Sequence, residues 1–325
     1  MKTLYLDGCA ELEVRLDGPA LRVRRPQHAD GQYPLPRISR VVSIGRVHWT
    51  LQALEACLRE HKPVAVLDSR GRFVRLLFRS PQHSYGLARH LGELLAVPRF
   101  RARYEHWYRT AERTAMTATL RRLDIRCVGL HPDRAWQLAC LRQFQLWGFR
   151  TGSCHRYLLG LAAAQIASAL AILGLPKDPE FWMREEYRLF TDLLALERWQ
   201  QLALLERALA TLPQQPSRRE LTTAFEAASA DRERRIAAWR KRMLLAMMGL
   251  ARNPNRPAPC SSRSPAGGSA KFPLNLSKAR RTASTCITNA GRIPFGSRRS
   301  LRTSVRILRA YLSYDWRVYE SDGKA

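Results

Sequence analysis

The sequence predicts an α+β protein in which a small N-terminal β-sandwich-like domain precedes a larger all-α domain. Apolar and charged residues alternate at period two through residues 1–80, as in half-buried strands. From about residue 85 to residue 250, apolar residues instead recur at helical spacing. After residue 250 the composition changes to Pro, Ser and Gly. We therefore expect a β domain at 1–85, a helical domain at 86–250 and a basic, disordered low-complexity tail at 251–325.

The first 80 residues contain the expected strands. "TLYLDG" and "ELEVRLDGPALRVRR" alternate at period two, and the second contains Asp17-Gly18, a two-residue hairpin signal. "ISRVVSIG", "PVAVLD" and "RGRFVRLLF" are further β-rich runs. Between them, "TLQALEACLREHK" has helical spacing, with Thr50 as its N-cap.

Amphipathic helices are expected from residue 86 onwards. Ser217 and Glu220 have capping-box spacing at the start of the last one. The uncharged run 157–175 approaches membrane-spanning length, but its six alanines, Gln165 and Ser168 favour a buried bundle helix. The expected helices are 86–96, 99–123, 133–146, 154–174, 186–210 and 217–249.

The charge favours a nucleic-acid partner. The 325 residues include 55 basic and 27 acidic ones, a net charge of +28, and only 7 of the basic ones are lysine. Arginine matches phosphate geometry with two parallel donors. An anionic membrane surface and a merely solvated arginine surface are the alternatives. The tail carries 15 basic and 3 acidic residues; it is either a nucleic-acid-binding arm or a coding artefact, and both interpretations stay open.

Arginines and aromatic residues alternate in "YEHWYRTAERTAMTATLRR" and just before it. This pattern suits backbone contacts and base stacking on DNA. The alternative is an aromatic core stripe with a solvated arginine face. The candidate DNA-binding residues are Arg101, Arg103, Arg109, Arg113, Arg121 and Arg122.

The cysteines and short motifs exclude several classes of protein. Seven scattered cysteines without a CxxC pair argue against a disulfide framework and a structural zinc site, and fit a reducing, cytoplasmic compartment. The N-terminus lacks the apolar run of a secretory signal. No phosphate-cradling glycine loop, HExxH or GxSxG occurs.

Carboxylates gather in "KDPEFWMREEYRLFTDLLALERW". Phosphodiester chemistry uses carboxylates to hold Mg²⁺ or Mn²⁺. Asp192 lies between Phe190 and Leu193 of an apolar helix, where an aspartate is costly unless it is paired or bound to metal. A metal ligand and a surface or N-cap role are both open for Asp192.

The N-terminal residues resemble the CRISPR spacer-acquisition integrase and endonuclease family, the first of the numbered Cas proteins. The similarity lies in "LYLDG", "LRV" and "YPLPRISRVVSIGRVHWTLQALEACLREHKPVAVLDSRGR". It implies a metal-binding glutamate nine residues before the glycine of a "GL.P" turn; counted back from Gly174, that position is Gln165. The family's histidine has no counterpart after Pro179, where Glu185 is the candidate substitute, and the family's aspartate corresponds to Asp192.

The resemblance implies a magnesium- or manganese-dependent, hydrolase-type nuclease and integrase of antiviral defence. Such a protein is a homodimer through its β domain, assembles with a small CRISPR adaptation subunit and inserts double-stranded spacer DNA into the repeat array. Because an amide oxygen is a poorer ligand than a carboxylate, we expect the catalytic site to be impaired. The alternatives are a non-catalytic DNA-binding scaffold subunit and an unrelated basic nucleic-acid-binding protein. No membrane association is expected.

Overall fold

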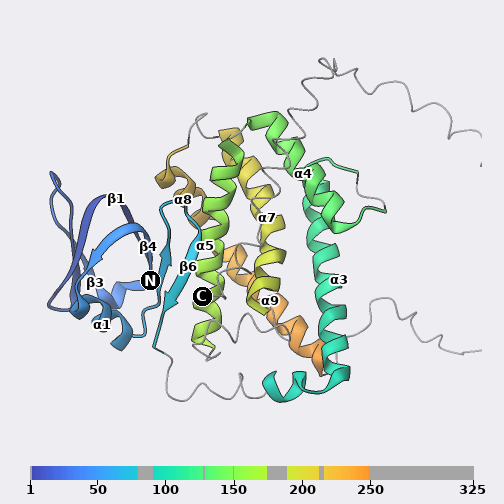
Figure 1. Cartoon of the computed structure of the whole chain (residues 1–325), viewed down its shortest axis with the longest axis horizontal. Coiled ribbons are helices and arrows are strands. Elements are labelled where there is room, and N and C mark those ends of the chain that lie inside the picture. The colour runs from blue at the N-terminus through green and yellow to red at the C-terminus, as the bar shows by residue number, and fades with distance from the viewer. Residues whose placement is uncertain are drawn as a thin grey trace, which may run out of the picture. The chain divides into compact units, whose positions relative to one another are not determined.

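The computed structural model describes residues 2–79, 91–126, 129–148, 150–173, 189–211 and 216–248, all within one compact unit, Met1–Ala251. The predicted α+β class is confirmed, because the strands form an N-terminal mixed sheet and the rest of the described chain is helical (Figure 1). The tail at 251–325 and the candidate ligand Glu185 lie outside the described residues.

The strands form a single six-stranded sheet in the order β3-β2-β1-β4-β5-β6. The pairs β1–β4 and β4–β5 are parallel, and the other neighbours are antiparallel. Asp17 pairs with Ala20, so the predicted hairpin turns at Gly18-Pro19, and Gly18 supplies the positive φ of 56° that the turn needs. The strands are β1 (Lys2–Asp17), β2 (Ala20–Arg24), β3 (Gly31–Pro34), β4 (Ile38–Trp49), β5 (Val64–Leu67) and β6 (Phe73–Leu77), with a 3₁₀ turn at Leu35–Arg37.

Apolar side chains lie on both faces of the sheet, because the central strands β4 and β5 carry consecutive apolar residues. On one face, Leu4 and Leu6 share a core with Cys57 of helix α1 (Leu51–Arg59). On the other, Val42 and Ile44 join a core formed with the later helices. The predicted N-cap of α1 is present: the Ala53 N–H donates to the Thr50 hydroxyl at 3.4 Å.

The helical region departs from the prediction at its end. The single helix expected over 217–249 is two helices that meet at Ala228, where ψ is 6°. The predicted capping box is present, with the Ser217 N–H donating to the Glu220 carboxylate at 2.7 Å. The expected helix at 86–96 lies partly outside the described residues. The helices are α3 (Pro98–Arg122), α4 (Pro132–Trp147), α5 (Arg150–Ile172), α7 (Leu189–Thr211), α8 (Arg218–Ala227) and α9 (Ser229–Met247).

Helix α5 lies between the sheet and α7 (Figure 1). Its contact with the sheet is close: a Cβ on Gly160 would lie 1.8 Å from the carbonyl oxygen of Gly71. Leu158, Leu161 and Ala163 are buried, as expected for a bundle helix. Within the described ranges, no helix is long and apolar enough to cross a membrane. Because α5 and the sheet share one core, and the boundary expected at residue 85 falls outside the described residues, the division into two domains remains a prediction.

Candidate metal and nucleic-acid site

Gln165 is buried in the middle of α5, with 1% of its surface exposed. Its Oε1 accepts a hydrogen bond from Nε of Arg232, and its Nε2 donates to the Glu233 carboxylate at 3.2 Å. Both partners come from α9, which follows the α8–α9 break. The amide is therefore satisfied through both of its ends by one neighbouring helix.

Arg232 is fully buried, and α8 helps to hold it. Its Nη2 donates to the Phe225 carbonyl oxygen at 3.1 Å, and its guanidinium lies 3.4 Å from the centre of the Phe225 ring. Burial lowers its pKa to about 10, which the neighbouring Glu197 opposes. Arg232 therefore keeps its positive charge at neutral pH.

Glu197 of α7 supplies the buried negative charge in this cluster. It is fully buried, and burial raises its pKa. Arg235 donates to its Oε1 at 2.9 Å, and Gln201 donates to the same oxygen at 2.8 Å. We call Gln165, Glu197, Gln201, Arg232 and Arg235 the α5–α7–α9 cluster.

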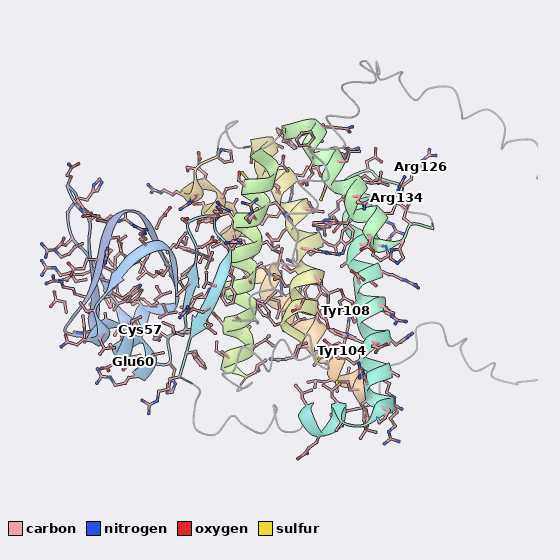
Figure 2. The ribbon with its side chains drawn as sticks, viewed as in Figure 1. Cys57, Glu60, Tyr104, Tyr108, Arg126 and Arg134 are labelled. Atoms are coloured by element: carbon pink, nitrogen blue, oxygen red, sulfur yellow. The ribbon has the colours of Figure 1, made fainter. Side chains whose placement is uncertain are left out.

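Asp192 lies in the first turn of α7 and is half-buried. The hydroxyl of Tyr104 donates to its Oδ2 at 2.6 Å. Tyr104 and Tyr108 project from α3 into the helical region (Figure 2). Burial and the Asp192 carboxylate raise the pKa of Tyr104, so this side chain remains a neutral donor.

These residues do not fit a divalent cation. Gln165 presents a neutral amide oxygen that a guanidinium already occupies, so a cation there would meet Arg232. Among the described residues, no three His, Cys, Asp or Glu side chains are grouped so that they could hold a metal ion. Whether Glu185 approaches Gln165 and Asp192 stays a prediction, because it lies outside the described residues.

The six candidate DNA-binding arginines all lie exposed on α3. Tyr104 and Trp107 of the same helix are buried, so they form a core stripe and cannot stack on bases. Arg101 and Arg109 flank Glu105, at 3.8 Å and 3.4 Å. Arg103 donates to the Met247 carbonyl oxygen at 3.1 Å, and Arg122 donates to Gln200 at 3.4 Å. Within the described chain, the side chains of Arg113 and Arg121 have neither a hydrogen bond nor an ion pair.

Sequence reasoning missed Arg232, although a signal for it exists. The buried residues of α9 recur at helical spacing through Ile236, Trp239 and Met243, and Arg232 occupies the preceding position of that stripe. A charged residue on an apolar stripe is costly unless it is paired. Glu197 lies in the carboxylate-rich segment "KDPEFWMREEYRLFTDLLALERW", but no local pattern distinguishes it from its neighbours there.

The sequence and fold match known proteins. The family model described as CRISPR associated protein Cas1 matches residues 9–124. A Cas1 protein from Thermotoga maritima is 11% identical, with a TM-score of 0.59 over 77% of this chain and 97% of that one. TtCas1 in complex with DNA is 15% identical, with a TM-score of 0.51 over 79% and 95%. A casposase bound to its integration product is 12% identical, with a TM-score of 0.50 over 70% and 82%. A search of curated proteins returns no match.

At these low identities the solved structures show the fold: an N-terminal mixed sheet followed by a helical region. Residues 9–124 carry the sequence pattern of the CRISPR-associated Cas1 family, and solved Cas1 proteins share the fold of this chain. The predicted resemblance to that family is therefore confirmed.

Proposed function

We propose that this chain is a DNA-binding Cas1 protein of CRISPR adaptation whose metal-dependent integrase site is impaired. The observation that carries this proposal is the buried contact between Arg232 and Gln165. At the position where the family resemblance expects a carboxylate and a cation, this chain has an amide and a guanidinium.

Two physical effects act together at this position. An amide oxygen is a weaker ligand than a carboxylate for a hard cation such as Mg²⁺. The guanidinium adds a fixed positive charge that repels a second cation at short range. Among the proposed ligands, Gln165 is an amide and Glu185 lies outside the described residues, which leaves Asp192 as the carboxylate that can be placed. Its Oδ2 already accepts a hydrogen bond from the Tyr104 hydroxyl.

DNA binding is supported by charge and by the relatives. The six arginines of α3 lie on an exposed surface, and contacts from arginine to phosphate position DNA largely without regard to sequence. One structural relative was solved with DNA and another with an integration product. We extend double-stranded DNA binding to this chain on that basis.

The remaining parts of the proposal come from the family resemblance. We propose a homodimer formed through the β domain at 1–85, a helical domain at 86–250 with the DNA site, and a basic tail at 251–325. The dimer would assemble with a small adaptation subunit in the cytoplasm. Complete loss of metal chemistry would make the chain a DNA-binding scaffold subunit of that complex.

The test is a strand-transfer assay with Mn²⁺ on the purified protein, with DNA binding measured in parallel. The wild type should bind duplex DNA, with or without chelator, and yield no joined product. Gln165→Glu alone should stay inactive, because the new carboxylate would pair with Arg232.

Two outcomes would contradict the proposal. Joined products from the wild type that disappear in Asp192→Ala would show a working site. Activity gained by Gln165→Glu alone would show that Arg232 does not block the cation. The double variant Gln165→Glu/Arg232→Gln separates these effects, because it keeps the carboxylate and removes the guanidinium.

A further inference from the structure

A pocket of about 560 Å³ lies between α7 and the start of α9, beside the α5–α7–α9 cluster. Four arginines line it, two from α9, one from α7 and one from the end of α3. Two of its lining side chains, Gln201 and Arg232, are 1% and 0% exposed, so they form a buried inner wall. The lining arginines are Arg122, Arg207, Arg232 and Arg235.

The inner wall has hydrogen-bonding atoms without partners. Within the described chain, Nη1 of Arg232 and Nε of Arg235 are buried donors that meet no acceptor. Oε1 of Gln201 is a buried acceptor that meets no donor. Each such atom costs free energy unless a ligand or water satisfies it. A ligand that fits must therefore bring strong acceptors and also a hydroxyl or amine donor.

The charge at the inner wall is positive. Glu197 neutralises one of the two guanidinium groups of Arg232 and Arg235. The nearby Glu226 is itself paired with Arg40 at 3.6 Å and accepts from the Tyr5 hydroxyl. Because position 165 is an amide, α5 adds no negative charge. One buried positive charge is left for the pocket.

The mouth of the pocket adds to this charge. Arg122 and Arg207 are exposed there. Two carboxylates also line the pocket, Glu206 and Asp231, and Asp231 is paired with Arg234. The α9 N-terminus at Ala228, which has no side-chain cap, lies in the same wall, and helix N-termini favour anions.

We propose that this pocket binds a phosphate monoester, carried either by a free nucleotide or by the 5′ end of a DNA strand. Guanidinium groups bind phosphate oxygens with two parallel hydrogen bonds, and a monoester offers three terminal oxygens to several arginines. The closed inner wall suits a terminal group better than a backbone that continues. The apolar walls of Ala203, Leu204 and Ala210 leave room for a sugar or base, whose hydroxyl or amine can donate to Gln201.

The first arm of the test uses a free nucleotide. Adenosine 5′-monophosphate and adenosine are titrated into the full-length protein by calorimetry. The nucleotide should bind and adenosine should not. Arg207→Glu should weaken binding by about tenfold or more, because it reverses a charge at the mouth. Arg134→Glu changes an exposed α4 residue, labelled in Figure 2, that does not line the pocket; this variant is the matched control and should bind like the wild type.

The second arm compares a short DNA duplex that has 5′-phosphates with the same duplex bearing 5′-hydroxyls, by fluorescence anisotropy. A preference for the phosphorylated duplex, lost in Arg207→Glu and kept in Arg134→Glu, assigns the pocket to DNA ends. Binding of the nucleotide without that preference assigns it to a free nucleotide. The proposal is overturned if the variants melt like the wild type and the binding of both probes is independent of their phosphates and of Arg207. Neither arm measures strand transfer, and the nucleotide arm needs no duplex binding, so the nucleotide result is independent of the proposed function.

Discussion

His155 is a buried histidine that neither the metal site nor the pocket uses. It lies on α5 with its ring centre 5.5 Å from that of Trp136, and its Nε2 has no hydrogen-bond partner within the described residues. Burial lowers its pKa from 6.5 to about 4, since the charged imidazolium is poorly solvated there. Folding therefore requires the neutral ring.

This depressed pKa predicts acid sensitivity. Between pH 6.5 and about pH 4 the unfolded chain binds a proton at His155 and the folded chain does not. Stability is therefore fully present above pH 6.5 and falls as the pH drops through this window, by up to about 3 kcal/mol. Urea unfolding at pH 7 and pH 5 measures this loss, and His155→Phe should show a smaller one.

A matched variant separates His155 from other titrating groups. His106→Gln changes an exposed histidine on α3 and should keep the pH dependence of the wild type. The raised pKa of Glu197 acts in the opposite direction but is common to all three proteins. If His155→Phe lost as much stability between pH 7 and pH 5 as the wild type, the buried-neutral assignment would be wrong.

At the residue scale, the sequence predicted some positions because their signals are local. Thr50 and Ser217 cap helices through atoms three residues away, so spacing alone identifies them. The place of Gln165 followed from the family resemblance. Its partner Arg232 is 67 residues further along the chain, and no local pattern joins the two.

The contact between α5 and the sheet is tight enough to test with one methyl group. A Cβ on Gly160 would lie 1.8 Å from the Gly71 carbonyl oxygen, a backbone atom that cannot rotate away. Gly160→Ala should therefore cost about 1–3 kcal/mol, the usual cost of overpacking, despite the better helix propensity of alanine. Thermal melting followed by circular dichroism checks this, with a fall of roughly 2–4 °C expected per kcal/mol.

Gly92→Ala is the control for this substitution. Among the described residues, none lies within 4 Å of a Cβ at Gly92, so alanine should be tolerated there. An unchanged or higher melting temperature for Gly160→Ala would mean that α5 and the β5–β6 turn are further apart than the structure has them.

The α8–α9 break shows what sequence could not predict at the element scale. Residues 217–249 contain no proline or glycine before Gly249, so the pattern predicts one continuous helix. The chain instead leaves helical geometry at Ala228, and Arg232 turns back to the Phe225 carbonyl and ring. The break therefore depends on tertiary contacts of a buried arginine, which local propensity does not report.

For the whole molecule, hydrophobic periodicity predicted the α+β class and the change from strands to helices. It did not predict that all six strands form a single sheet, in which β1 pairs with both β2 and β4. Strand order depends on pairings between distant segments. A strand shows the same alternating pattern whichever strand it pairs with, so the pattern does not identify the partner.

Net charge is the whole-molecule property that the proposed function uses. The chain carries +28, and α3 presents six exposed candidate arginines to DNA. We expect the logarithm of duplex affinity to fall linearly with the logarithm of salt concentration, with a slope set by the number of phosphates neutralised. The guanidinium groups of Arg113 and Arg121 have no partner within the described chain, so both should contribute in full.

The double variant Arg113→Gln/Arg121→Gln should therefore lower the slope by about 2 and weaken binding similarly for unrelated duplex sequences. Anisotropy titrations between 50 and 200 mM salt, over which the Debye length falls about twofold, measure both quantities. Arg103→Gln is the comparison: its guanidinium holds the Met247 carbonyl, so this change should lower the melting temperature more than the slope. If the double variant is stable and its slope is unchanged, DNA does not bind along α3. Basic residues of other elements must then contact the phosphates.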